Sequence, residues 1–208
     1  MAAIPSEGSR SQPSQASALD LDPALIQKSP VLQRWLREIP DVAAEIANDP
    51  SFRTRLRSIY TQANYGSGLQ IGVEEVRLAR TRFTVSADYR SVQRPAWGTD
   101  LRYYVRPLGS YVNVAPVVGY RSVKVNDESV QGVNLGVRLL VVLSRTGGAD
   151  LSVTQTWVAP GSDREVGLST VSLGYALTRQ LRLSTDFQRQ NSRVGRDDRV
   201  GIGLEWML

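Results

Sequence analysis

From about residue 54 to the end of the chain, apolar and polar residues alternate one by one. Residues 130–144, for example, place Val133, Leu135 and Val137 in alternation with Asn134 and Gly136. Successive side chains of a β-strand point to opposite faces of the sheet, so this pattern predicts antiparallel strands with one apolar and one polar face. Ten such segments are predicted, at 54–62, 68–77, 81–91, 97–106, 111–123, 130–144, 150–159, 166–177, 180–190 and 198–208.

The connections between these segments indicate how the sheet closes. Those after the even-numbered strands are short, as at Thr178-Arg179, whereas those after the odd-numbered strands are longer and more polar, as at 191–197. Outer-membrane barrels have this asymmetry and an even number of strands. We therefore expect an all-β fold, a closed antiparallel transmembrane β-barrel of ten strands. Eight strands is the alternative, because the segment 54–62 is weak.

The direction of the apolar face separates a membrane barrel from a soluble one. The polar face is rich in small residues such as Gly98, Gly136 and Gly174, which suit a narrow lumen. The aromatic residues of the apolar face fall near the strand ends, as in the interfacial girdles of membrane barrels. These predicted membrane-interface aromatics are Tyr60, Phe83, Tyr89, Trp97, Tyr103, Tyr120, Trp157, Tyr175, Phe187 and Trp206.

Charges of both signs occupy the polar face, which we assign to the lumen. Buried charges must pair, and the similar numbers of acids and arginines make pairing feasible. The predicted lumen charge network comprises Glu74, Asp88, Arg90, Asp100, Arg102, Arg106, Arg121, Arg138, Arg182, Asp186 and Glu205. The alternative is a soluble, lipocalin-like barrel, in which the same alternation is turned inside out around an apolar ligand.

Composition narrows the functions available to such a barrel. The chain contains no Cys and no His, so it lacks the most common general base and two common metal ligands. We therefore predict no enzymatic activity, no metal and no cofactor. The formal net charge is +5, but the arginines are spread singly along the strands, so we predict no binding of nucleic acid. No apolar run reaches the length of about 18 residues that a membrane-spanning helix needs.

The first 53 residues lack the alternation. Residues 1–21 are rich in Ser, Gln, Ala and Pro and are predicted to form a disordered leader. In residues 22–53, Pro residues after capping residues and an apolar stripe that includes Trp35 predict short amphipathic helices. The leader has no apolar signal-peptide core, so an outer-membrane location would require that a signal peptide has been removed.

The last strand, RVGIGLEWML, resembles the C-terminal strand of bacterial outer-membrane β-barrel proteins. Such strands usually end in an aromatic residue, whereas here Leu208 is last and Trp206 lies two positions earlier on the same face. Other stretches, including DLRYYVRPLGSYVNVAPVVGYR and LSRTGGADLSVTQTWVAPGSDREVGL, resemble a family of uncharacterised cyanobacterial proteins over residues 29–208. The resemblance implies an outer-membrane location and assigns no activity to any residue.

These observations predict a non-enzymatic outer-membrane barrel whose principal partner is the lipid bilayer. It would be structural or anchoring, or a narrow channel, with a lumen that its charged side chains largely plug. An alternative is a receptor barrel that binds lipopolysaccharide or a protein through the charged loops at 160–165 and 193–199.

Overall fold

The computed structural model describes residues 29–31, 49, 51–64, 66–79, 81–91, 95–125, 128–144 and 148–208. The chain divides into two compact units, Met1–Val42 and Ala43–Leu208, and every strand belongs to the second. In the first unit Pro30 and Val31 are helical, whereas the predicted leader 1–21 and most of the predicted helical segment 22–53 lie outside the described residues. No helix among the described residues is long and apolar enough to cross a membrane.

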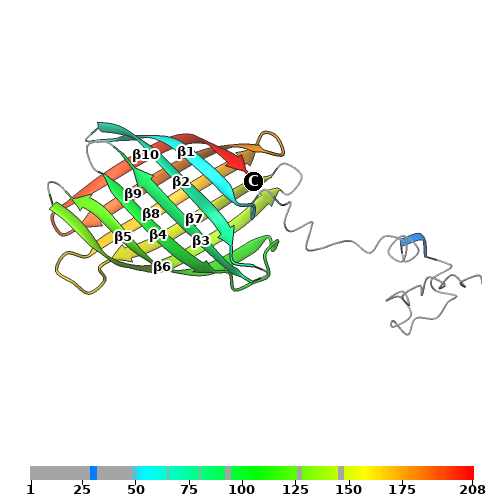
Figure 1. Cartoon of the computed structure of the whole chain (residues 1–208), viewed down its shortest axis with the longest axis horizontal. Helices are drawn as coiled ribbons and strands as arrows, with labels where there is room; N and C mark the ends of the chain where they lie inside the picture. Colours follow the sequence, from blue (N-terminus) through cyan, green and yellow to red (C-terminus); the bar gives the residue numbers. More distant parts are fainter. Residues whose placement is uncertain are drawn as a thin grey trace, which may run out of the picture. The chain divides into compact units, whose positions relative to one another are not determined.

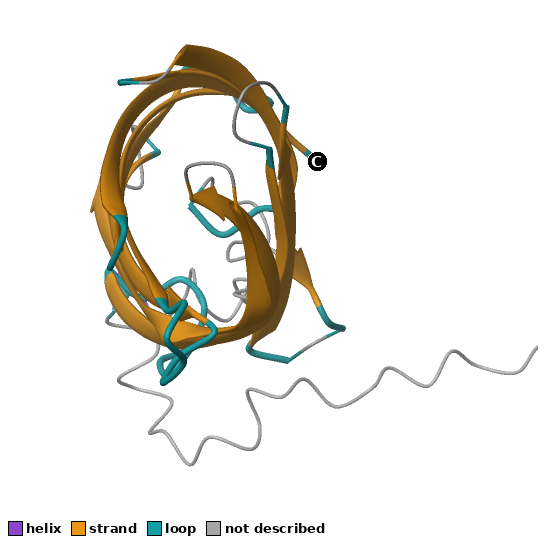
Figure 2. Ribbon diagram, turned by 90° about the vertical axis from the view of Figure 1, so that its left-hand side faces the viewer, coloured by secondary structure: helices purple, strands orange, loops and turns teal. Residues whose placement is uncertain are grey.

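Ten antiparallel strands form a closed barrel, which confirms the predicted fold class and the larger of the two strand numbers (Figures 1 and 2). Neighbours in sequence are neighbours in the sheet, and β1 closes the ring by pairing with β10 from Arg55↔Met207 to Ala63↔Arg199. The strands are β1 Arg55–Ala63, β2 Gly66–Arg77, β3 Phe83–Arg90, β4 Ala96–Tyr103, β5 Val112–Val125, β6 Glu128–Ser144, β7 Ala149–Val158, β8 Val166–Ala176, β9 Leu181–Ser192 and β10 Gly195–Met207.

The predicted contrast between short and long connections is wrong. We call the end where β1 begins and β10 ends the terminal end, and the opposite one the far end. At the far end only residues 193–194 separate β9 from β10, whereas at the terminal end residues 104–111 separate β4 from β5. Polar residues such as Asn191 and Asp198 continue the strands, because backbone groups form the ladder whatever the side chain. Connection lengths therefore do not orient this barrel.

The burial of the two strand faces is inverted relative to a soluble protein. In β10 the outward Val200, Ile202 and Leu204 are 48%, 60% and 50% exposed, whereas the inward Glu205 is 2% exposed. The same alternation recurs in β5, β6 and β9. Water disfavours a continuous apolar exterior, and large exposed apolar surfaces mark membrane or partner contacts. The lipocalin-like alternative requires the opposite arrangement and is therefore wrong.

An arginine on the outward face tests this arrangement. Leu139 lies midway along the outward apolar residues of β6, so Leu139→Arg should destabilise a bilayer-embedded barrel by about 2–4 kcal/mol. Val194→Arg, at the exposed β9–β10 turn, is the control and should change stability little. Denaturant unfolding in lipid vesicles measures both, and equal effects of the two substitutions would contradict a lipid-facing exterior.

Candidate functional site

Ten of the eleven residues predicted for the lumen network lie on the inward face of strands. The exception is Arg106, because β4 ends at Tyr103 and Arg106 is exposed in the connection to β5. Its backbone N–H donates to the side-chain oxygen of Asn113 at 3.0 Å. The alternation of Val105 and Arg106 continued the strand pattern beyond the true end of the strand. The inward ten are Glu74, Asp88, Arg90, Asp100, Arg102, Arg121, Arg138, Arg182, Asp186 and Glu205.

Nearest the terminal end, the lumen holds a layer of equal numbers of arginines and carboxylates. We call it the charged layer; it consists of Arg55, Arg57, Arg102, Arg138, Arg182, Glu74, Glu75, Asp150, Asp186 and Glu205. The side chains are no more than 13% exposed. Full pairing is what allows so many ionised groups to remain buried.

Arg57 of β1 pairs with carboxylates from three other strands of the charged layer. Its guanidinium lies 2.7 Å from Glu74 of β2, 2.8 Å from Asp186 of β9 and 2.7 Å from Glu205 of β10. Planar guanidinium groups can donate to several carboxylates at once, which a lysine ammonium does with less defined geometry. The near absence of lysine from the chain therefore suits this interior.

Two glycines let arginines reach across an intervening strand. Arg182 of β9 lies 2.6 Å from Asp150 of β7, and its guanidinium passes over Gly174 of β8, where an added Cβ would lie 1.7 Å from Nη2. Arg121 of β5 passes over Gly98 of β4 in the same way, with an added Cβ 2.8 Å from its guanidinium carbon. These two glycines of the polar face thus leave room that the arginine side chains occupy.

A β-bulge delivers an additional carboxylate that the alternation did not predict. Val73 pairs with Ala87 and Val76 with Val85, so Glu74 and Glu75 together oppose a single residue of β3. Glu75 adopts a left-handed conformation with φ of 58°, and both glutamates face the lumen. Without the extra residue, strict alternation would turn Glu75 to the apolar exterior. The bulge therefore keeps the exterior apolar and adds a charge to the interior.

Glu75 joins opposite sides of the barrel. Its carboxylate accepts hydrogen bonds from Arg102 of β4 and from the hydroxyl of Tyr104, both at 2.8 Å, and lies 4.0 Å from Arg138 of β6. Strands β2 and β6 stand four places apart in the ring of ten. The contact with Arg138 therefore spans the lumen.

A second group of polar contacts lies closer to the far end. Arg121 pairs with Asp88 and with Asp100, each at 2.8 Å, and Asp100 also accepts a hydrogen bond of 2.7 Å from Asn134. Arg90 of β3 donates to Gln188 of β9 at 3.1 Å, a second contact across the lumen. Polar side chains therefore bridge the interior at two levels.

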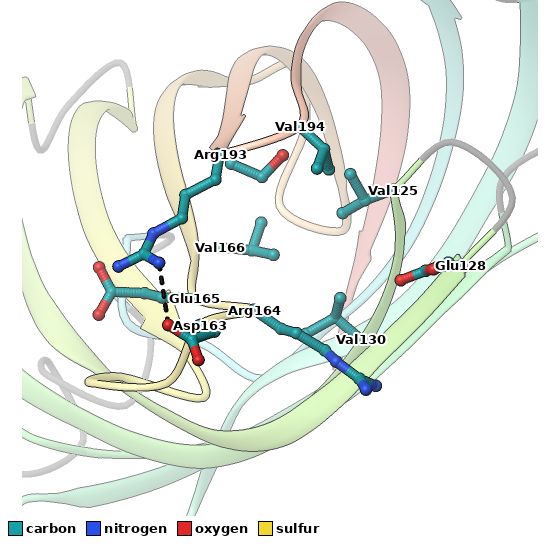
Figure 3. A pocket seen from close by; sticks show the side chains of 10 residues that line it. Val125, Glu128, Val130, Asp163, Arg164, Glu165, Val166, Arg193 and Val194 are labelled. Carbon is teal, nitrogen blue, oxygen red and sulfur yellow. Dashed lines mark hydrogen bonds and ion pairs between the residues drawn. The ribbon is translucent and has the colours of Figure 1, made fainter.

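Apolar clusters lie towards both ends of these polar layers. The cap at the terminal end comprises Phe52, Tyr104, Ala115, Leu140 and Val142, with the Phe52 and Tyr104 rings edge to face at 6.0 Å. The cap at the far end comprises Ala96, Val123, Val125, Val130, Val158, Val166 and Leu168. Outside it lies a cavity of about 280 Å³ at the barrel mouth, lined in part by Val125, Val166 and Val194 (Figure 3). Polar and apolar side chains thus alternate in layers along the interior.

The sequence prediction missed Arg55, Arg57, Glu75, Asp150 and Tyr104. Arg55 and Arg57 lie in the predicted first strand, and alternation from the outward Tyr60 assigns both to the lumen, so the signal that could have found them was present. Asp150 stands at the start of a predicted strand, and strict alternation from Val153 assigns it inward. Glu75 had no such signal, because a bulge interrupts the pattern.

The predicted interface aromatics lie on the outward face. Nine of the ten are between 38% and 57% exposed, and Tyr103 is half-buried against Phe83 with ring centroids 4.8 Å apart. Trp97 and Tyr120 form a second outward pair at 5.8 Å. Their contact with a lipid interface is a prediction.

The arrangement offers little for acid–base or metal chemistry. Carboxylates that could act as an acid–base pair are not brought together. Asp88 pairs with Arg121 and Asp186 with Arg57, whereas the neighbours Asp197 and Asp198 point to opposite faces of β10. Among the described residues no group of three potential ligands could hold a metal ion. Because arginines already occupy these carboxylates, they suit a structural role better than acid–base or metal chemistry.

Several solved structures of outer-membrane barrels are similar to this chain in fold. The KdgM porin is 12% identical with a TM-score of 0.47, over 74% of this chain and 99% of the porin. The Acinetobacter baumannii outer membrane protein Omp33 is 10% identical with a TM-score of 0.41, over 76% and 98%. Outer membrane phospholipase A from Escherichia coli is 13% identical with a TM-score of 0.40, over 77% and 96%. Such distant likeness assigns neither a function nor a ligand.

The chain matches no protein-family model and no curated protein.

Removing one buried charge from the charged layer should lower the free energy of unfolding. Glu75→Gln keeps the size of the side chain but leaves Arg102 and Arg138 without their shared carboxylate, so we expect a loss of about 3–5 kcal/mol of unfolding free energy. Asp163→Asn breaks the exposed pair with Arg193 and should cost less than about 1 kcal/mol. Denaturant unfolding of both variants provides the comparison; a Glu75→Gln barrel as stable as Asp163→Asn would mean that the layer does not hold the barrel together.

Proposed function

We propose that the chain is a non-enzymatic outer-membrane β-barrel with a closed lumen, which serves a structural or anchoring role. The observation that carries this proposal is the inversion of burial: apolar side chains cover the outside, whereas paired charges fill the inside. Closed barrels leave no unpaired backbone edge, so they satisfy the backbone within a bilayer. The barrel and its exterior together fit a lipid environment.

The filled lumen supports a closed barrel over a narrow channel. Ions would have to pass two apolar caps as well as the charged layer, where Glu75 and Arg138 approach from opposite sides. A ten-stranded barrel is only slightly wider than an eight-stranded one, whose interior side chains can fill completely. The closed form is therefore the one we propose.

Three finer features remain part of the proposal. The first is the absence of enzymatic activity, which is supported by the lack of His and Cys in the chain and by the arginine-bound carboxylates. The second is delivery to the outer membrane through a signal peptide that has been removed. The third is descent from the uncharacterised cyanobacterial family that the chain resembles.

A receptor role for the far end is less well supported. Of the charged positions predicted for the last loop, Arg196, Asp197, Asp198 and Arg199 lie within β10, and Asp197 and Arg199 are buried and paired with each other. Arg193 remains exposed but pairs with Asp163 at 2.9 Å. Arginines that already have carboxylate partners attract the phosphates of lipopolysaccharide less strongly.

Refolding with and without detergent tests membrane insertion. The barrel should fold in micelles, resist SDS without heating, and migrate at a shifted position from the boiled sample on a gel. Folding in plain buffer without detergent would contradict the membrane proposal.

Conductance in planar bilayers tests closure of the lumen. Wild-type barrel should show no steps above the lipid background. The charge-neutral double variant Glu75→Ala, Arg138→Ala removes the contact across the charged layer and should conduct measurably more. Its control, Arg189→Ala with Asp198→Ala, removes a pair on the outward surface and should stay closed. Large wild-type conductance would favour the narrow channel instead.

A further inference from the structure

On four adjacent strands the outward side chains change from apolar to polar at one register. The last apolar row is Val153, Val171, Phe187 and Val200 of β7 to β10. The next outward row towards the far end is Gln155, Ser169, Arg189 and Asp198, and the one beyond it is Trp157, Gly167, Asn191 and Arg196. In a membrane-embedded barrel this boundary lies where acyl chains give way to lipid headgroups.

A surface cavity of about 450 Å³ opens in these polar rows, and Trp157, Gly167 and Asn191 line it. The three residues are directly opposite one another on β7, β8 and β9, so they lie side by side across the outward face. The volume falls within the range of about 300–1,000 Å³ that small-molecule sites occupy. The cavity is therefore large enough for one or two sugar rings.

Gly167 keeps the space beside the Trp157 ring open. A Cβ added at Gly167 would lie 3.8 Å from Cδ1 and Nε1 of the indole and 3.8 Å from the backbone oxygen of Asn191. These are ordinary van der Waals distances. Trp157 is 39% exposed. Among the described residues, neither the indole N–H of Trp157 nor the side-chain amide of Asn191 has a hydrogen-bond partner. The cavity thus combines the flat, apolar indole ring of Trp157 with neutral hydrogen-bonding groups that have no partner among the described residues.

The charged groups that border the cavity are already engaged. Arg193 pairs with Asp163 at 2.9 Å (Figure 3), and Glu165 accepts a hydrogen bond of 2.8 Å from the backbone N–H of Gly161. In the adjacent row Asp198 binds both Arg189 and Arg196. Because Arg193 is already paired and the Glu165 carboxylate would repel an anion, the free groups favour a neutral ligand over a phosphate.

We propose that this cavity binds the neutral sugar headgroup of a glycolipid, with a pyranose ring stacked on Trp157 and its hydroxyls bonded to Asn191. One face of a pyranose presents C–H groups that pack on an aromatic ring, while its equatorial hydroxyls both donate and accept at the edge. The position at the polar boundary of the lipid-facing surface favours a lipid-linked sugar over a free one. The inference rests on the proposed membrane function.

Lipid retention from nanodiscs tests the site. Wild-type barrel is reconstituted with phosphatidylcholine, phosphatidylglycerol and a monohexosyl diacylglycerol, released in mild detergent, and examined by native mass spectrometry. The hexosyl lipid should be retained several-fold above its share of the mixture. Gly167→Leu fills the cavity without a backbone clash at Cβ, and Trp157→Leu removes the aromatic ring. Both substitutions should abolish the enrichment of the hexosyl lipid. Trp97→Leu, at an outward tryptophan away from the cavity, is the control and should keep it.

The possible outcomes distinguish a lipid-linked sugar from a free sugar, and failure of the sugar site from failure of the proposed membrane function. Displacement of the lipid by a methyl hexoside would show that the sugar ring itself is recognised. Binding of the hexoside without lipid enrichment would support the sugar site but assign it to free saccharide. Enrichment of phosphatidylglycerol instead, or enrichment that survives Gly167→Leu, would overturn the site while leaving an inserted barrel intact. A barrel that fails to enter nanodiscs would overturn the membrane function and the site together.

Discussion

Charge neutralisation inside the barrel is the constraint on which the remaining features depend. Where apolar side chains cover the exterior, the alternating polar side chains of the ten strands are directed into one narrow space. An unpaired ion there would be costly, and breaking one pair of a buried set is strongly unfavourable. The charged layer meets this requirement with equal numbers of arginines and carboxylates that contact one another around the ring. The choice of arginine over lysine follows from the same need.

The backbone adjusts wherever side-chain alternation alone would leave the network incomplete. Gly98 and Gly174 open spaces through which arginines reach the second strand away, and the bulge at Glu74 and Glu75 places two carboxylates where the pleat allows one. Apolar clusters then pack beside the charges towards both ends. A barrel built in this way is held together by ion pairs that link many of its strands. This is why a structural or anchoring role suits it better than transport.

The outward face of the barrel is not apolar over its whole length. On β7 to β10 the apolar surface stops at one register, and the polar rows beyond it carry a tryptophan beside a glycine and a free amide. Interfacial tryptophans anchor barrels without any specific ligand. At Trp157 the open space and the neutral hydrogen-bonding groups add the elements of a recognition site, so anchoring and headgroup binding would use the same residue.

The sequence by itself determined the strands, their number and the face that most strand residues occupy, because a period of two is a local property of the extended backbone. It therefore placed Glu205 and Arg182 inside and Trp206 outside correctly, but it misjudged where strands end, as at Arg106 and in the last hairpin, since polar residues sustain a ladder as well as apolar ones. Only the tertiary structure decided which charges meet. Pairs such as Glu75 with Arg138 depend on the register of strands that are far apart in the chain and on a bulge that reverses the local alternation.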